Sequence, residues 1–252
     1  MGNKKDIYLG STYSNKYGET VEIIEYNNNK DVYIKYGNGY VCHTQINNLK
    51  QGRFSSPYAK KYCGVGFIGE GDYSPTVNGV KTNAYKAWCQ MLERCYGNKS
   101  TENNVGYKST VIEEWHCFQN FAKWYEENYY EVKGERMCLD KDILVKNNTL
   151  YSPLTSCIVP NSINTLLIKS DKARGQFPIG VSFKKGEGYY ARCNNEFGHT
   201  ILIGIFDTPK DAFKAYKKFK ENTIYLRVKK LAHVLPTNVV DALLSYEVEI
   251  DD

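Results

Sequence analysis

The stretch PIGVSFKKGEGYYARCNNEFGHTILIGIFDTPKDAFKAYKKFK, residues 178–220, combines three short alternating segments with one amphipathic segment. Apolar and polar residues alternate from Val181 to Ile203 with the two-residue period of half-buried strands. Gly and Asn clusters at 186–188 and 195–198 supply the positive φ angles that hairpins need. The pattern therefore predicts a three-stranded antiparallel sheet.

A helix is expected directly after the third strand. Thr208 stands at the N-cap position, Pro209 at the first helical position and Asp211 at the third. Apolar residues at helical spacing follow, namely Ala212, Phe213, Tyr216 and Phe219. These side chains can cover one face of the predicted sheet.

By strand parity, the opposite face of the sheet carries polar side chains. The residues expected there are Ser182, Lys184, Tyr190, Arg192 and Asn194, with Lys172, Arg174 and Lys185 nearby. Cations bind phosphates, and Arg or Asn can make two hydrogen bonds to the edge of guanine or adenine. This face is therefore either a nucleic-acid-binding surface or an ordinary solvated polar face.

Four short motifs within the stretch carry a family resemblance. They are Gly180-Val181, Tyr189-x-Ala191, Ile203-Gly204-x-Phe206-Asp207-Thr208 and Ala212-x-x-Ala215-Tyr216. Together they resemble the Apetala/ethylene-response-factor type of DNA-binding domain, which also occurs in phage and mobile-element proteins. The resemblance implies that the sheet enters the major groove while the helix packs behind it. The strands of that family usually carry more Arg on the reading face, where this chain has Ser182 and Lys184. We therefore do not transfer the base specificity of the family to this chain.

Length and composition limit the number of domains and the class of protein. A chain of 252 residues with 42% hydrophobic residues can form two or three small domains. It contains no apolar run long enough to cross a membrane and no signal peptide at its start, so we expect a cytoplasmic protein without membrane contact. The eight cysteines form no CxxC pair, which favours reduced core thiols over a zinc site.

Charge is distributed unevenly along the chain. The net charge is +5, and residues 165–235 hold 14 Lys and Arg against 6 Asp and Glu. Residues 236–252 hold five acidic residues and no Lys or Arg. The basic charge is therefore concentrated on the segment that is expected to bind DNA.

The N-terminal third predicts β structure. Residues 6–52 alternate in short runs separated by Asn- and Gly-rich turns, which favours a small, compact barrel. Glycines at 64, 66, 69 and 71 are not followed by a Gly-Lys-Ser/Thr motif, so no nucleotide cofactor is expected. Asn78-Gly79 predicts a hairpin.

Two helices are expected in the centre of the chain. Thr82 caps a segment whose buried face carries Trp88, and Glu114 opens a second segment with Trp115. These aromatic stripes are typical of a packed core. His116 is either a catalytic residue or a packed histidine.

Residues 137–168 predict strand, turn, strand and a short helix that starts after Pro160. The HNH nucleases use this ββα order to hold a metal ion on a phosphodiester. Asp140, Lys141 and Asp142, with Asn161 and Asn164 on the helix, occupy the corresponding positions. Asp140 and Asp142 are thus either metal ligands or residues that cap a turn and pair with Lys141 or Arg136.

The resemblance extends over residues 6–250. It rests on the β-unit and on further motifs: Tyr85-x-x-Trp88-x-x-Met91-Leu92-x-Arg94-Cys95-Tyr96, Trp115-x-x-Phe118-x-x-Phe121, Leu139-Asp140-Lys141-Asp142, Tyr151-Ser152-Pro153, Val159-Pro160 and Ile163-Asn164. This set is similar to phage HNH-type homing endonucleases that carry an Apetala-type domain. The resemblance implies double-stranded DNA as the partner and, in active members, Mg²⁺ or another divalent metal.

The chain departs from that family at its centre. Lys141 stands where an active HNH site places His, and Ser152-Pro153-Leu154-Thr155-Ser156 stands where related proteins read Ser-Pro-Glu-Asn-Cys. A protonated lysine cannot ligate a metal and would need a strongly lowered pKa to act as a base. Both departures remove site chemistry that the family uses.

The sequence thus predicts an α+β protein in four parts. These are a barrel-like unit at 1–60, a central helical domain with the ββα element at 61–170, the Apetala-type domain at 171–236 and an acidic helix or tail at 237–252. The first functional hypothesis is sequence-specific binding of double-stranded DNA with a degenerate nuclease centre. The alternatives are an active metal-dependent endonuclease and a counter-defence factor that binds a host or phage protein.

Overall fold

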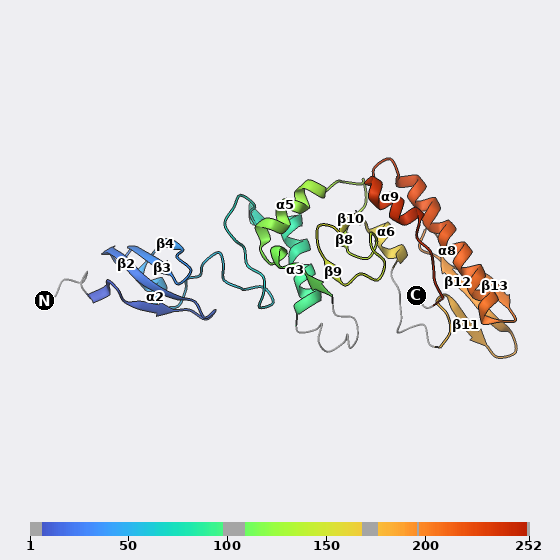
Figure 1. The fold of residues 1–252 in the computed structure, drawn as a ribbon, viewed down its shortest axis with the longest axis horizontal. Coiled ribbons are helices and arrows are strands. Elements are labelled where there is room, and N and C mark those ends of the chain that lie inside the picture. The colour runs from blue at the N-terminus through green and yellow to red at the C-terminus, as the bar shows by residue number, and fades with distance from the viewer. Residues whose placement is uncertain (1–6, 98–108, 168–175, 196, 251–252) are drawn as a thin grey trace. The chain divides into compact units, whose positions relative to one another are not determined.

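The computed structural model describes residues 7–97, 109–167, 176–195 and 197–250 (Figure 1). The fold is mixed α+β, as predicted, and the chain divides into two compact units, Met1–Glu127 and Asn128–Asp252. The finer boundaries expected at 60, 170 and 236 stay a prediction. In the second unit, helix α8 (Pro209–Leu231) packs on both the ββα element and the C-terminal sheet, and so joins them.

The N-terminal unit begins with a four-stranded antiparallel sheet. Its strands are β1 (Thr12–Ser14), β2 (Thr20–Asn28), β3 (Asp31–Tyr36) and β4 (Val41–Thr44), in that spatial order. Burial alternates along β2 and β3, so that Val21, Ile23, Val32 and Ile34 form the core of the sheet. The alternation read from the sequence is confirmed here.

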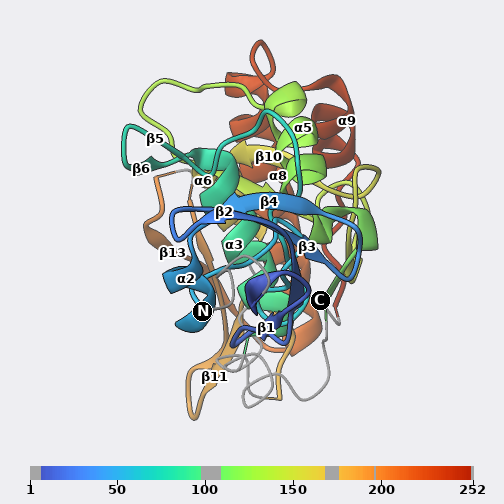
Figure 2. The same ribbon diagram turned by 90° about the vertical axis from the view of Figure 1, so that its left-hand side faces the viewer.

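The predicted barrel is wrong, because β1 and β4 are the two edges of an open sheet in the part of the chain that the structure describes. A barrel would require its two edge strands to pair, whereas among the described strands β1 pairs with β2 and β4 pairs with β3. Helix α2 (Ile46–Lys50) instead places Ile46 and Leu49 against the core. Figure 2 shows this sheet and helix from the side that faces left in Figure 1.

The rest of the first unit is mainly helical. Its elements are β5 (Thr76–Val77), β6 (Val80–Lys81), α3 (Asn83–Tyr96), β7 (Thr110–Val111), the 3₁₀ helix η1 (Glu113–His116) and α5 (Phe118–Asn128). Asn78 and Gly79, both with positive φ, form the predicted hairpin between β5 and β6. Thr82 Oγ1 accepts a hydrogen bond from the backbone N–H of Tyr85, which confirms the predicted cap.

The helix expected from Glu114 is divided into η1 and α5, which form a packed aromatic core together with α3. Trp88, Trp115 and Phe118 are buried, and the Trp88 indole N–H donates to the backbone oxygen of Trp115 at 2.7 Å. This bond satisfies the one polar group of a fully buried indole. The expectation of a packed centre is confirmed.

The second unit opens with the predicted ββα element. Strand β8 (Met137–Asp140) pairs antiparallel with β10 (Cys157–Pro160), and α6 (Asn161–Asn164) follows at once. The loop between the strands contains β9 (Leu150–Tyr151), and the 3₁₀ helix η2 (Thr165–Leu167) follows α6.

The C-terminal sheet consists of β11 (Val181–Lys184), β12 (Gly188–Asn194) and β13 (Thr200–Phe206), in that order and antiparallel. Helix α8 covers one face, where Ala212, Phe213 and Tyr216 pack on Val181 and Ala191. Thr208 Oγ1 accepts from the backbone N–H of Asp211 at 3.1 Å, as the sequence predicted for the cap.

Helix α8 has 23 residues and is therefore about 35 Å long, which exceeds what the small sheet needs. Its C-terminal half places Ile224 and Val228 against the ββα element and against helix α9 (Thr237–Leu244). The acidic end of the chain then returns along α8, where Val248 enters the core of the sheet. Figure 1 shows α8 extended beside the sheet with α9 at its far end.

All eight cysteines are free thiols. Within the described residues, no helix is both long enough and apolar enough to cross a membrane.

Candidate nucleic-acid interface and ββα centre

One face of the C-terminal sheet is not covered by helix α8. Cross-strand pairing sets Ser182 opposite Tyr190, while Val181 pairs with Ala191 and faces the helix. Arg192 and Asn194 follow Tyr190 at the two-residue period of β12, so they share its side of the sheet. We call the side that carries these residues and Lys184 the open face.

Most side chains predicted for the open face are exposed. Ser182, Lys184, Arg192 and Asn194 are exposed on the strands, and Lys185 is exposed in the hairpin between β11 and β12. Lys172 and Arg174, also predicted to contact DNA, lie outside the described residues.

Tyr190 is the least accessible of the residues predicted for the open face that the structure describes, since it is only 8% exposed. Its hydroxyl donates to a carboxylate oxygen of Glu187, and the Arg192 guanidinium lies 5.1 Å from the centre of its ring. A guanidinium that rests on an aromatic ring loses part of its freedom before any ligand binds. Tyr190 thus positions Arg192 more than it offers a contact surface of its own.

Glu187, in the hairpin, binds one cation and one tyrosine of the open face, Lys184 and Tyr190. Its carboxylate pairs with Lys184 and accepts the Tyr190 hydroxyl, and both contacts lower the pKa of Glu187. The same bond raises the pKa of Tyr190. The cluster is exposed and screened by solvent, so it orients side chains and contributes little to stability.

Asn194 is held at the far end of the open face. Its side-chain oxygen accepts a hydrogen bond from Thr200 Oγ1 at 2.8 Å, across the β12–β13 pair. The bond fixes the plane of the amide relative to strand β13.

Sequence reasoning missed two aliphatic residues of the open face, Leu202 and Ile205. The pairing of β12 with β13 shifts between Ala191 and Arg192, so Leu202 lies opposite Arg192 and Ile205 lies opposite Tyr190. Strict alternation would place these two residues on opposite faces. Gly204 was the available signal, since an isolated glycine within a strand often marks a bulge.

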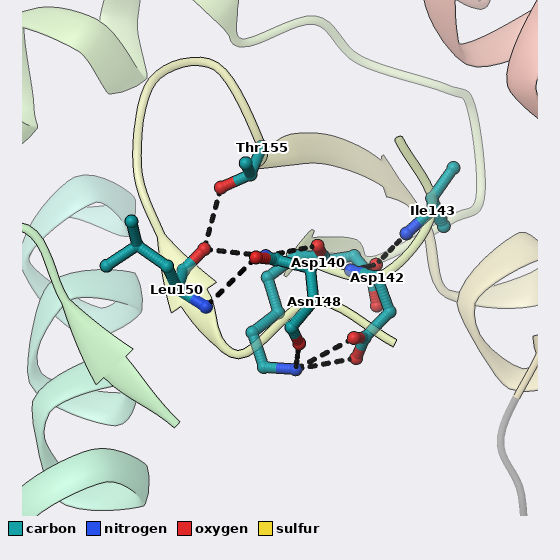
Figure 3. Close-up of polar contacts among 7 residues, drawn as sticks. Asp140, Asp142, Ile143, Asn148, Leu150 and Thr155 are labelled. Atoms are coloured by element: carbon teal, nitrogen blue, oxygen red, sulfur yellow. Dashed lines mark hydrogen bonds and ion pairs between the residues drawn. The ribbon is translucent and has the colours of Figure 1, made fainter. Parts of the chain in front are cut away.

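The second predicted centre, Asp140, lies at the end of β8 (Figure 3). Its Oδ1 accepts hydrogen bonds from the backbone N–H groups of Asp142 and Ile143 at 2.7 and 2.9 Å. Burial raises the pKa of Asp140, and these two bonds oppose the shift in part. Asp140 therefore caps the turn that leaves β8.

Lys141 points inward and is only 5% exposed. Its Nζ donates to both carboxylate oxygens of Asp142 at 2.8 Å and to the backbone oxygen of Asn148 at 2.6 Å. The Asn148 side chain donates to the backbone oxygens of Lys141 and Leu150. These two bonds connect the start and the end of the loop between β8 and β9 (Figure 3). The ammonium group of Lys141 thus stabilises this loop from its buried side.

The two aspartates are engaged in the way that the turn-capping alternative describes: Asp140 binds backbone N–H groups and Asp142 binds Lys141. Asp142 lies two residues beyond Asp140, the last residue of β8, so strand parity does not align the two carboxylates. No three His, Cys, Asp or Glu side chains among the described residues are grouped so that they could hold a metal ion.

The other predicted catalytic residues lie on other elements. His116 belongs to the first unit, where its Nε2 is 3.4 Å from the Tyr96 hydroxyl oxygen and burial lowers its pKa. Asn164 is the last residue of α6, and Asn161 at its start accepts from Arg136 Nη2 at 3.3 Å.

Comparisons with family models, curated proteins and solved structures found no match to this chain.

Proposed function

We propose that this protein binds double-stranded DNA through the open face of its C-terminal sheet. The observation that carries the proposal is the division of the sheet into two faces. Helix α8 covers one, and the other displays Lys184, Arg192 and Asn194 to solvent. A rigid sheet with cations and an amide on its free side matches the chemistry of a DNA edge and backbone.

The dimensions of the sheet fit the major groove. Three strands about 4.8 Å apart span about 10 Å between their outer axes, and the major groove of B-DNA is about 12 Å wide. Helix α8 then lies behind the sheet and away from the DNA. In this arrangement the helix supports the sheet and need not contact bases.

Each polar residue has a distinct proposed role. Arg192, oriented by the Tyr190 ring, makes two hydrogen bonds to a guanine edge, and Asn194 pairs with an adjacent adenine. Lys184 and Lys185 at the hairpin bind phosphates and set the register. Base contacts supply specificity, and phosphate contacts supply most of the salt-dependent affinity.

We propose further that the chain descends from the phage HNH homing-endonuclease group and that its nuclease centre is degenerate. The β8, β10 and α6 order supports the kinship. The internal bonds of Lys141 and Asp142 support the loss of activity, because the Asp142 carboxylate already binds an ammonium group. In this view the ββα element is a scaffold beside the DNA-binding sheet.

Fluorescence anisotropy with a labelled pool of random 20-bp duplexes, at about 50 and 200 mM salt, tests the binding. Affinity should fall steeply between the two salt concentrations, by about 0.9 log units per log unit of salt for each phosphate neutralised. Arg192→Ala should weaken binding to duplexes selected from the pool by about tenfold or more. Lys214→Ala removes the same charge from the exposed side of α8 and should change affinity less than twofold.

Negligible affinity for the pool at about 50 mM salt contradicts the proposal and moves the protein-binding alternative to first place. The nuclease alternative has its own assay, in which supercoiled plasmid is incubated with the protein and Mg²⁺ or Mn²⁺. We expect no metal-dependent cleavage. Cleavage that is lost in the Asp140→Ala/Asp142→Ala double variant would establish the enzyme instead.

A further inference from the structure

Strand β13 contains a bulge that changes which side chains reach the open face. Arg192 pairs with Leu202, whereas the preceding residue Ala191 pairs with Gly204, so Ile203 is an extra residue. Beyond the bulge, Ile205 lies opposite Tyr190 on the open face. A regular strand would have turned Ile205 toward helix α8.

The bulge exposes the Ile205 side chain, which a regular strand would have turned toward helix α8, and Leu202 lies beside it on the open face. Leu202 is 50% exposed and Ile205 is 48% exposed, although both lie in an otherwise polar surface. Bulges commonly re-aim a side chain near a functional site. Single exposed aliphatic residues are ordinary, but here the backbone itself departs from regular geometry and both residues flank the Arg192 cluster.

The position of Leu202 limits what it can touch. Residues paired directly across two strands have Cβ atoms about 5 Å apart, so Leu202 lies within reach of whatever the Arg192 side chain binds. In the major groove, the apolar feature that a base edge offers is the C5-methyl group of thymine. Aliphatic side chains beside an arginine therefore match a thymine that neighbours a guanine.

We propose that Leu202 and Ile205 read thymine by contact with its C5-methyl group. The proposal rests on the proposed function, because it names the base class that the same open face recognises. Lys184, Arg192 and Asn194 on the first two strands then form the polar half of the surface, and β13 forms its apolar half. The alternative occupant of this apolar half is a second copy of the chain, since β13 is an edge strand.

Uracil substitution tests the methyl contact directly, because uracil differs from thymine in major-groove chemistry only by the missing methyl group. Duplexes of 20 bp are first selected from a random pool by the wild-type protein. Each thymine of the selected sequence is then replaced singly by uracil, and affinity is measured by anisotropy. We expect at least one position at which uracil weakens binding about fourfold, which is the effect of about 0.8 kcal/mol for one buried methyl group.

Matched variants assign that effect to the two side chains. In the Leu202→Ala/Ile205→Ala protein, the thymine-to-uracil affinity ratio should fall to about one at the sensitive position, as expected for coupled groups. Ile201→Ala is the control, because Ile201 is 37% exposed on the same strand but pairs with Cys193 on the helix-covered side. This control should keep the fourfold ratio.

The outcomes separate the two proposals. If duplex binding is salt-dependent but every uracil position behaves like thymine, or if no sequence is enriched, methyl reading is overturned while DNA binding stands. If duplex DNA does not bind at all, both fall. If light scattering shows a dimer that Leu202→Ala/Ile205→Ala converts to a monomer, and uracil has no effect, the apolar half is a self-association surface and the inference is overturned.

Discussion

The ββα element and the C-terminal sheet carry similar charged residues but use them in opposite ways. In the ββα element, the Lys141 ammonium is buried against Asp142 and a backbone oxygen. On the sheet, the side chains of Lys184 and Arg192 are exposed to solvent. Polar groups that are satisfied internally hold a fold together, whereas exposed and pre-oriented ones remain available to a ligand.

The carboxylates of the two regions show the same contrast. Burial is the main influence on Asp140 and raises its pKa. Contacts with Lys184 and Tyr190 are the main influence on Glu187 and lower its pKa. Desolvation thus governs the ββα centre, and neighbouring groups govern the open face.

The largest expected effect comes from a substitution that disturbs the packing of the C-terminal sheet on helix α8 and leaves the residues of the ββα element unchanged. Gly180 has a φ of +74°, and a Cβ atom there would overlap the ring of Tyr216 on α8. Gly180→Ala should lower the free energy of unfolding by about 2 to 5 kcal/mol, from backbone strain and overpacking together. Urea denaturation measures the loss.

Gly186→Ala is the control for that change. Its φ is +84°, but nothing lies within 4 Å of a Cβ atom there, so it should lose only the strain of about 1 to 2 kcal/mol. Equal losses in the two variants would mean that the close approach of Gly180 to helix α8 is not what matters.

The next effect compares one lysine from each region. Lys141→Met keeps the aliphatic volume but removes the buried hydrogen bond from the ammonium group to the Asn148 oxygen, and should cost about 1 to 3 kcal/mol. Lys184→Met, from the exposed ion pair with Glu187, should leave thermal unfolding unchanged within error. If Lys141→Met did not lower stability either, the two lysines would not differ in their contribution to the fold.

Substitutions of Asp140 test the buried hydrogen bonds of the ββα element. Asp140→Ala removes the acceptor for two backbone N–H groups and should cost about 1 to 3 kcal/mol, whereas Asp140→Asn keeps an oxygen in place and should be tolerated. Comparable losses in the two variants would show that capping is not the role of Asp140.

The sign of the pH effect follows from the raised pKa of Asp140. Between the ordinary and the raised pKa, the folded protein binds more protons than the unfolded chain, so this group lowers stability as pH rises through that interval. Thermal melts at several pH values should show that Asp140→Asn removes this decrease. An unchanged pH profile would contradict the assignment.

The smallest expected effect lies on the open face. Glu187→Gln keeps a hydrogen-bond acceptor for Tyr190 but removes a negative charge from beside Lys184. Affinity for duplex DNA should rise about twofold to fivefold at low salt and lose this gain at high salt, because the interaction is screened. Weaker binding in anisotropy assays would mean that the carboxylate itself contacts the DNA.

Much of the fold could be predicted because its signals are local. Alternation identified β2, β3 and the three strands of the C-terminal sheet, and Thr82 and Thr208 marked two helix starts. The open N-terminal sheet could not be predicted, since closure depends on whether two distant edge strands meet. The role of Asp140 as a cap was one of two alternatives, and strand parity could not decide between them.

The sequence by itself determined the strands, the turns and the polar side chains that β11 and β12 place on the open face, because each depends on residues a few positions apart. Only the tertiary structure decided that Lys141 is buried, that Tyr190 supports Arg192 and that a bulge turns Ile205 outward. It also decided that α8 joins two cores, through Phe213 in the core of the sheet and Ile224 in the core of the ββα element. These features depend on packing between segments that are distant in the chain, and local periodicity does not encode them.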